Sequence, residues 1–133
     1  CGLDLSPSSA AAARMAATLC PDAPIATFHA VHVPFRSYLA PDRSAEDLRP
    51  FIVEATRKMD AWLPDAGLPA QCEKPAIIAE SVPLALRRMM EATNADLIAL
   101  GAHGRSSLAP THLGSFVEGL LYEPPCDVLV VRA

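Results

Sequence analysis

A glycine-rich stretch contains the residues of this sequence whose types and spacing could do chemistry. Three of the six glycines, Gly101, Gly104 and Gly114, lie in the segment GAHGRSSLAPTHLGS, which ends at Ser115. Glycine lets backbone amides approach a phosphate closely, and the amino-terminal end of a helix favours an anion. The pattern Gly-x2-Gly-x9-Gly-Ser is neither a Walker A motif nor the Gly-x-Gly-x-x-Gly dinucleotide fingerprint. A long, flexible connection is the alternative interpretation of the same glycines.

Alternating apolar and amphipathic stretches predict the elements that must position these residues. The predicted strands cover residues 1–3, 25–33, 76–80, 95–100 and 126–131. The last three are nearly continuous apolar runs, which is typical of parallel strands covered on both faces. The predicted helices cover residues 6–20, 44–63 and 82–94, with a fourth from residue 115 onward. This alternation indicates βαβ units with right-handed crossovers.

The predicted fold class is α/β, a Rossmann-like three-layer α/β/α sandwich around a five-stranded parallel sheet. With the strand order 3-2-1-4-5, ligands would bind between the first and fourth strands, outside their carboxyl ends. Asp4 ends the first strand and Gly101 follows the fourth, so this topology brings the two together. A carboxylate there can accept hydrogen bonds from a ribose or an adenine amino group, while loop amides hold phosphates.

Local signals predict where the helices begin. Ser6 is a candidate N-cap, and Pro7 stands at the first helical position. Pro50 either starts the second helix or kinks it. Glu118 follows Ser115 by three residues, which is the spacing of a capping box for the last helix.

Composition limits the class of protein. A chain of 133 residues, of which 51% are hydrophobic, predicts one domain over 1–133 with a single core. The net charge of −4 and the lack of a basic stripe argue against nucleic-acid binding. No apolar run approaches the roughly 20 residues that span a bilayer. Four scattered cysteines without a Cys-x-x-Cys pair favour a reducing compartment, so we expect a cytoplasmic protein.

The sequence opens as if in the middle of a strand, without an initiator methionine. We therefore expect the first strand to be truncated. Whether the domain stands alone or forms half of a tandem protein is left open.

The histidines are weaker candidates for a functional site than the glycine-rich stretch. His29 and His32 are three apart on a predicted strand, so they point to opposite faces and cannot readily share a metal. His103 and His112 both fall in the glycine-rich stretch, but no third ligand has a recognisable spacing. A serine–histidine–aspartate triad is conceivable, but no Gly-x-Ser-x-Gly elbow supports it. We expect no metal site and no catalytic residue.

Taken together, the glycine pattern, the aspartate that ends the first strand and the terminal DVLVVR strand resemble the universal stress protein family. The resemblance covers essentially the whole chain, from GLDLS through FHAVHV to CDVLVVRA. It implies a fold related to the adenine nucleotide alpha hydrolases. The subgroup with this glycine pattern resembles nucleotide binders, which implies ATP or a related adenine nucleotide, with or without Mg²⁺. The resemblance also implies a homodimer paired through residues 126–131.

The resemblance implies roles for individual residues. Asp4 would hold the adenosine portion, with Leu5 and Ser6 in the same turn, and Val33 would lie against the adenine. The residues expected around the phosphates are Gly101, Gly104, Gly114 and Ser115, with backbone amides near His103, Arg105 and Phe116.

Three positions depart from the family pattern. Leu5 stands where many members have glycine, Phe116 is bulky, and Val117 replaces a small or hydroxylated residue. We expect a regulatory, nucleotide-binding stress-response protein without efficient catalysis, because no general base or arginine finger is identifiable. The alternatives are a nucleotide-free dimerisation or interaction module of the same fold, which Phe116 and Val117 would favour, and an enzyme on a related scaffold.

Overall fold

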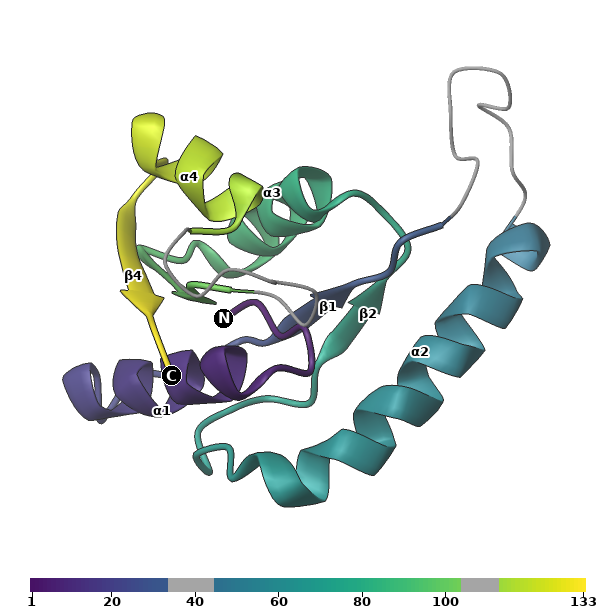
Figure 1. Cartoon of the computed structure of the whole chain (residues 1–133), viewed down its shortest axis with the longest axis horizontal. Coiled ribbons are helices and arrows are strands. Elements are labelled where there is room, and N and C mark those ends of the chain that lie inside the picture. Colours follow the sequence, from purple (N-terminus) through teal and green to yellow (C-terminus); the bar gives the residue numbers. More distant parts are fainter. Residues whose placement is uncertain (34–44, 104–112) are drawn as a thin grey trace.

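The computed structural model describes residues 1–33, 45–103 and 113–133. Helices and strands alternate along these segments, as the sequence predicts for an α/β fold (Figure 1). The helices are α1 (Pro7–Leu19), α2 (Ala45–Ala66), α3 (Val82–Thr93) and α4 (Ser115–Tyr122). The strands are β1 (Phe28–Ala30), β2 (Ala76–Ile78), β3 (Leu97–Gly101) and β4 (Asp127–Val131). In the described part of the chain, no helix is both long and apolar enough to cross a membrane.

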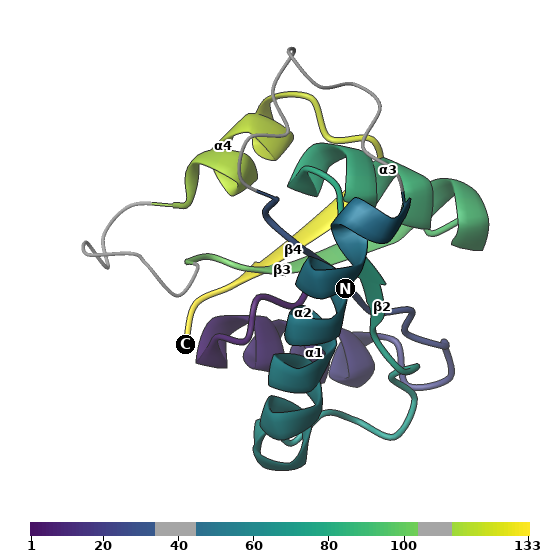
Figure 2. The same cartoon turned by 90° about the vertical axis from the view of Figure 1, so that its right-hand side faces the viewer.

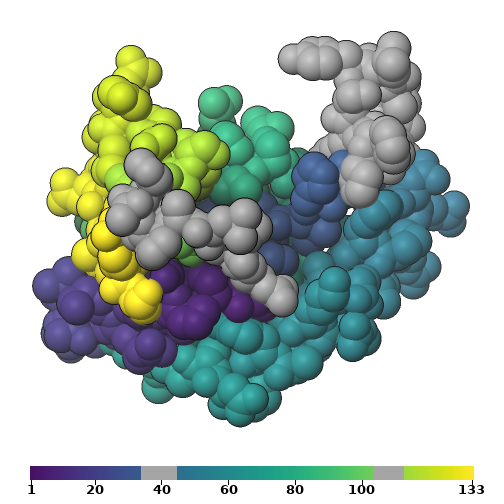
Figure 3. Space-filling model, in the orientation of Figure 1, coloured from purple at the N-terminus to yellow at the C-terminus, as the bar shows by residue number. Residues whose placement is uncertain are grey.

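The strands form the middle layer of the molecule. Figures 1 and 2 both show α3 and α4 on one side of the strands and α1 on the other. Helix α1 packs on β3 and β4, α3 on β1, and α2 on β2. In the space-filling view, the purple atoms at the start of the chain lie between the yellow of β4 and the teal of α2 (Figure 3).

The described strands form two parallel two-stranded sheets, whereas the sequence predicts a single five-stranded sheet. In one sheet Phe28 of β1 lies opposite Ala76 of β2. In the other, Leu97 of β3 lies opposite Asp127 of β4. The predicted strand at 25–33 is too long, because only residues 28–30 pair continuously. Ile25, at its start, makes an isolated bridge.

Residues 1–3 lie between the two sheets and hydrogen-bond to both. The amide of Gly2 donates to Ala99 O of β3 over 3.1 Å, and the amide of Leu3 donates to Phe28 O of β1 over 2.8 Å. Gly2 also forms an isolated parallel bridge to Phe28. The sequence predicts a first strand here, and the segment occupies that place with a single bridge rather than a full strand.

Two apolar clusters hold the layers together. The larger one contains residues from the strands, α3 and α4: Phe28, Ile78, Ala85, Leu86, Ile98, Leu100 and Val117. The smaller one contains Ala12 and Ala16 of α1 with Ile25 and Ala99. Because the buried residues of α1 are all small, alanines and serines, this helix can approach β3 closely.

The predicted start of α1 is confirmed. The amide of Ser9 donates to Ser6 Oγ over 3.1 Å, and Pro7 is the first helical residue. Helix α2 begins at Ala45 and runs through Pro50, so this proline does not start the helix.

The capping box predicted for α4 is wrong by one residue. The helix begins at Ser115 as predicted, but its N-cap is Gly114, which has no side chain to accept a hydrogen bond. The reason is tertiary: the amide of Gly114 donates to Ala102 O over 3.0 Å, which fixes the chain one residue earlier.

Candidate functional site

A cavity of about 200 Å³ lies at the carboxyl ends of β1 and β3. Its lining comes from residues 1–4, the first turn of α1, β1, the end of β3 and the start of α4. The lining residues are Gly2, Leu3, Asp4, Ser9, Phe28, His29, Ala30, Val82, Leu100, Gly101, Ala102, Gly114, Phe116 and Val117. This is the edge at which ligands bind in open parallel sheets.

Asp4 stands in a tight polar turn between the sheet and α1. Its Oδ1 accepts hydrogen bonds from the amide of Ser6 over 3.1 Å and from Ser6 Oγ. Ser9 Oγ donates to Ser6 O over 3.0 Å and lies 3.4 Å from the amide of Asp4. Ser6 and Ser9 are buried and Asp4 is half-buried. One oxygen of the carboxylate therefore holds the turn that starts α1.

Leu5 has a left-handed backbone, with φ of 65°. Side chains other than glycine rarely adopt this region, because the Cβ crowds the following carbonyl oxygen. The sequence departs from the family pattern at this residue, where many members have glycine. The structure supplies the physical reason for that glycine.

The two described glycines of the motif have different surroundings. A Cβ built on Gly101 would lie 2.7 Å from the backbone nitrogen of Ser9 and 2.8 Å from the carbonyl carbon of Ser8. The close approach of α1 to β3 therefore requires glycine here, whatever the cavity contains.

Among the described residues, a Cβ on Gly114 would have only Ala102 O near it, at 3.8 Å. Gly114 also has an ordinary backbone, with φ of −62° and ψ of 143°. Within the described part of the chain, neither packing nor conformation therefore requires glycine at this position.

Helix α4 begins at this cavity. The first amides of a helix have no partner within the helix, and the N-cap Gly114 offers no side chain to them. The helix dipole adds the equivalent of roughly half a positive charge at this end. The start of α4 can therefore stabilise a negatively charged group.

His29 of β1 lines the cavity and was not expected to from the sequence. Its Nδ1 lies 2.6 Å from Leu3 O, and because a carbonyl only accepts, Nδ1 donates this hydrogen bond. In the neutral ring, Nε2 is then an acceptor. The odd spacing of His29 and His32 was the available signal, since it places one of them on each face of the strand.

The structure brings four of the predicted site residues to this cavity: Asp4, Gly101, Gly114 and Phe116. The described residues that do not line it are Leu5, Ser6, Val33, His103 and Ser115. Val33 is buried beyond the end of β1 rather than at the cavity wall. Gly104 and Arg105 lie outside the described residues.

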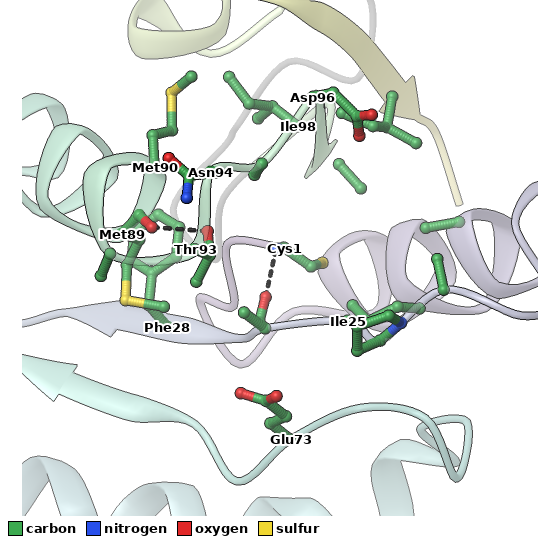
Figure 4. A pocket seen from close by; sticks show the side chains of 18 of the residues that line it. Cys1, Ile25, Phe28, Glu73, Met89, Met90, Thr93, Asn94, Asp96 and Ile98 are labelled. Carbon is green, nitrogen blue, oxygen red and sulfur yellow. Dashed lines mark hydrogen bonds between the residues drawn. The ribbon is translucent and has the colours of Figure 1, made fainter.

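A larger cavity, of about 560 Å³, lies at the opposite, amino ends of the strands. Figure 4 shows Cys1 in it between Phe28 and Ile25 on one side and Ile98 on the other. The backbone nitrogen of Cys1 donates to Ala26 O over 2.7 Å. Asp4 and the two described glycines of the motif, Gly101 and Gly114, do not line this cavity.

The sequence profile of the universal stress protein family matches residues 1–132, so the chain belongs to this family. Comparison with curated protein sequences finds no significant match.

Several solved structures have the same fold as this chain. The universal stress protein UspA from Lactobacillus plantarum has a TM-score of 0.71 at 23% identity, covering 98% of this chain and 94% of that one. The hypothetical protein MJ0577 has a TM-score of 0.70 at 22% identity, over 99% and 92%. A universal stress protein in complex with cAMP has a TM-score of 0.59 at 23% identity, over 98% and 92%.

Proposed function

We propose that this universal stress protein binds an adenine nucleotide, ATP or a relative of it, in the cavity at the carboxyl ends of its strands. The observation that carries the proposal is the convergence of Asp4, Gly101, Gly114 and Phe116 on one cavity. These residues come from three separate parts of the chain. They combine a carboxylate with the amino-terminal end of a helix.

The surroundings of Gly114 support a ligand. Packing among the described residues and the backbone conformation leave its glycine unexplained, whereas a group lying against it would explain the missing side chain. A phosphate there would face the first amides of α4. One of the solved structures that share the fold is a complex with cAMP, which is itself an adenine nucleotide.

The proposed division of roles follows from the chemistry of each wall. The Asp4 carboxylate, already anchored through Oδ1 by Ser6, would accept a hydrogen bond from the ribose. The start of α4, with Ser115 and the amide of Phe116, would receive the phosphate. By the family resemblance, Gly104 and Arg105 would complete the phosphate side, together with Mg²⁺ where ATP is bound.

We further propose a regulatory role that depends on binding, with ATP hydrolysis slow at most. The proposal includes a cytoplasmic location and a homodimer through the edge of β4. It also includes a continuous sheet in the order 3-2-1-4-5, supported by the hydrogen bonds from residues 1–3 to β1 and β3.

The test is calorimetric titration with ATP, with and without Mg²⁺, together with an assay for nucleotide retained through purification. Gly114→Asp adds a side chain and a negative charge at the proposed phosphate position, so binding should fall at least about tenfold. Gly119→Asp is the matched control, because a Cβ at Gly119 meets no atom within 4 Å and this glycine does not line the cavity.

If wild type gives no heat with any adenine nucleotide, the proposal fails. The protein would then be the nucleotide-free interaction module that Phe116 and Val117 suggest. If wild type and Gly114→Asp bound the nucleotide equally well, the nucleotide would have to bind away from the start of α4.

A further inference from the structure

We infer that the outer edge of β4 and one flank of α1 form a binding surface for a second copy of this chain, with Leu129 on the two-fold axis. The two β4 strands pair antiparallel, and the two α1 helices meet through Met15 and Leu19. The inference rests on the homodimer that the proposed function includes, and it assigns that homodimer a register and a helix contact.

The outer edge of β4 carries backbone groups that β3 does not use. Among the described residues, β4 pairs with β3 alone. The amide of Ala102, directly after β3, donates to Val131 O over 2.8 Å, so the backbone groups of Val131 face β3. These groups alternate along a strand of a parallel ladder, so those of Leu129 face β3 as well, while those of Val128 and Val130 face outward. An edge with unpaired groups is a template for another strand.

Two antiparallel copies of this edge can pair about Leu129 or about Val130. With Leu129 on the axis, Val128 of each copy lies opposite Val130 of the other. With Val130 on the axis, Val128 lies opposite Arg132, which is charged and exposed. Because β-branched side chains pack well against each other across strands, the register centred on Leu129 is favoured.

The charges at the ends of β4 favour a second copy in antiparallel orientation. Asp127 begins the strand and Arg132 follows its last residue, and both are exposed. Antiparallel pairing brings the acidic start of one strand near the basic end of the other, at both ends of the ladder. Parallel pairing would bring like charges together, which is destabilising. A surface that complements itself in this way suits a two-fold dimer.

The flank of α1 on the side of β4 carries exposed apolar side chains. The guanidinium of Arg14 donates to Ala66 O of α2 over 2.8 Å, so its flank of the helix faces α2. Figure 1 shows α2 and β4 at opposite sides of the molecule. At 3.6 residues per turn, Met15 and Leu19 lie about 100° and 140° around the helix from Arg14, across its solvent side. They therefore lie on the flank toward β4, against which α1 packs, and they are 44% and 58% exposed.

Symmetry brings these two flanks together. The axis that relates two antiparallel edges of one sheet is perpendicular to the sheet, so the α1 helices of both copies lie on the same face. Stable interfaces bury about 1,200–2,000 Å² in total, so two paired strands of five residues each need further contacts beside them. Met15 and Leu19 of both copies supply apolar area next to the axis.

Sedimentation equilibrium of the full chain measures the Kd of the dimer. Leu19→Lys should raise this Kd at least about tenfold, because like charges would meet where apolar side chains pack. A lysine suits the last residue of α1, so the monomer should keep its stability. Val53→Lys is the matched control, since Val53 is an apolar residue of α2 that is 60% exposed. It should keep the Kd within about twofold of wild type.

Oxidative cross-linking tests the register, in a Cys126→Ser background that removes the cysteine beside β4. With Leu129 on the axis, its two copies form a pair without hydrogen bonds, whose Cα atoms lie about 4.5 Å apart, within the range of a disulfide. The two copies of Val130 would lie about 7–8 Å apart, at or beyond that range. Leu129→Cys should therefore cross-link at least about tenfold faster than Val130→Cys. Cys126→Ser alone should stay non-covalent.

If Leu129→Cys does not fold, Val130→Pro tests the strand pairing in its place. Proline is tolerated in an edge strand where the N–H faces outward, so this variant should fold as a monomer. A folded Val130→Pro that still forms the wild-type dimer overturns the pairing through β4.

The outcomes are separable. A monomeric wild type overturns the inference together with the homodimer, whereas ATP binding by that monomer would leave the nucleotide proposal standing. Faster cross-linking by Val130→Cys than by Leu129→Cys overturns the register. An unchanged Kd in Leu19→Lys, or an equal increase in Val53→Lys, overturns the helix contact.

Discussion

At the carboxyl ends of the strands the cavity measures about 200 Å³, whereas at the amino ends it measures about 560 Å³. The smaller one combines Asp4, His29, three glycines and the start of α4. The larger one is lined mainly by apolar side chains of the strands, α1 and α3. Volume alone would favour the larger cavity as the candidate site. Convergent polar groups at the ligand-binding edge of a parallel sheet carry more weight.

Phe28 connects the two regions, because it lines both cavities and is only 3% exposed. Phe28→Ala should merge them and lower the free energy of unfolding by about 3–5 kcal/mol. Urea denaturation measures this loss. Tyr122→Ala, at an 88% exposed aromatic residue, is the control and should cost less than about 0.5 kcal/mol. A loss below about 1 kcal/mol at Phe28 would show that the two regions do not depend on a shared wall.

Serine substitutions at Gly101 and Gly114 distinguish a glycine that packing requires from one that it does not. Gly101→Ser should cost about 1–3 kcal/mol of stability, because its Cβ overlaps the backbone of Ser8 and Ser9. Gly114→Ser should leave stability within about 0.5 kcal/mol, since serine is a good N-cap and its Cβ has room. Thermal and urea unfolding of both variants provide the comparison. Equal losses would refute the distinction between the two positions.

The smallest effect is expected at Leu5. Leu5→Gly relieves a left-handed backbone that costs roughly 1–2 kcal/mol, partly offset by the greater freedom of glycine in the unfolded chain. Stability should rise by about 0.5–1 kcal/mol in urea unfolding. Leu84→Gly, at an exposed leucine inside α3, should instead lose roughly 1 kcal/mol. A destabilised Leu5→Gly would mean that the leucine side chain contributes more than its backbone costs.

Helix boundaries were predictable where the signals are local. Ser6 and Pro7 define the start of α1, and Asn94 ends α3 in a left-handed conformation. The predicted capping box of α4 is wrong because the N-cap position is set by the hydrogen bond from Gly114 to Ala102. That bond depends on the distant strand β3. The predicted strand lengths were wrong for a related reason, because an apolar run does not reveal how many of its residues find a hydrogen-bonding partner.

The candidate site was also predictable only in part. The expected strand order predicts Asp4 beside Gly101, and both residues line the smaller cavity. Their role in binding stays a prediction. The sequence could not show that α1 already explains Gly101, that Val33 lies away from the cavity, or that His29 lines it. Each of these facts depends on packing between segments far apart in the chain.

The segment that joins the two sheets is also the first part of this sequence to be synthesised. Gly2 cannot make its hydrogen bond to Ala99 until almost a hundred residues later. Contacts of such long sequence separation slow folding, and they expose unpaired backbone in the meantime. We expect the hydrogen bond between Gly2 and β3 to form late, after the ribosome has released β3. Until then the two halves of the domain depend on their own local packing.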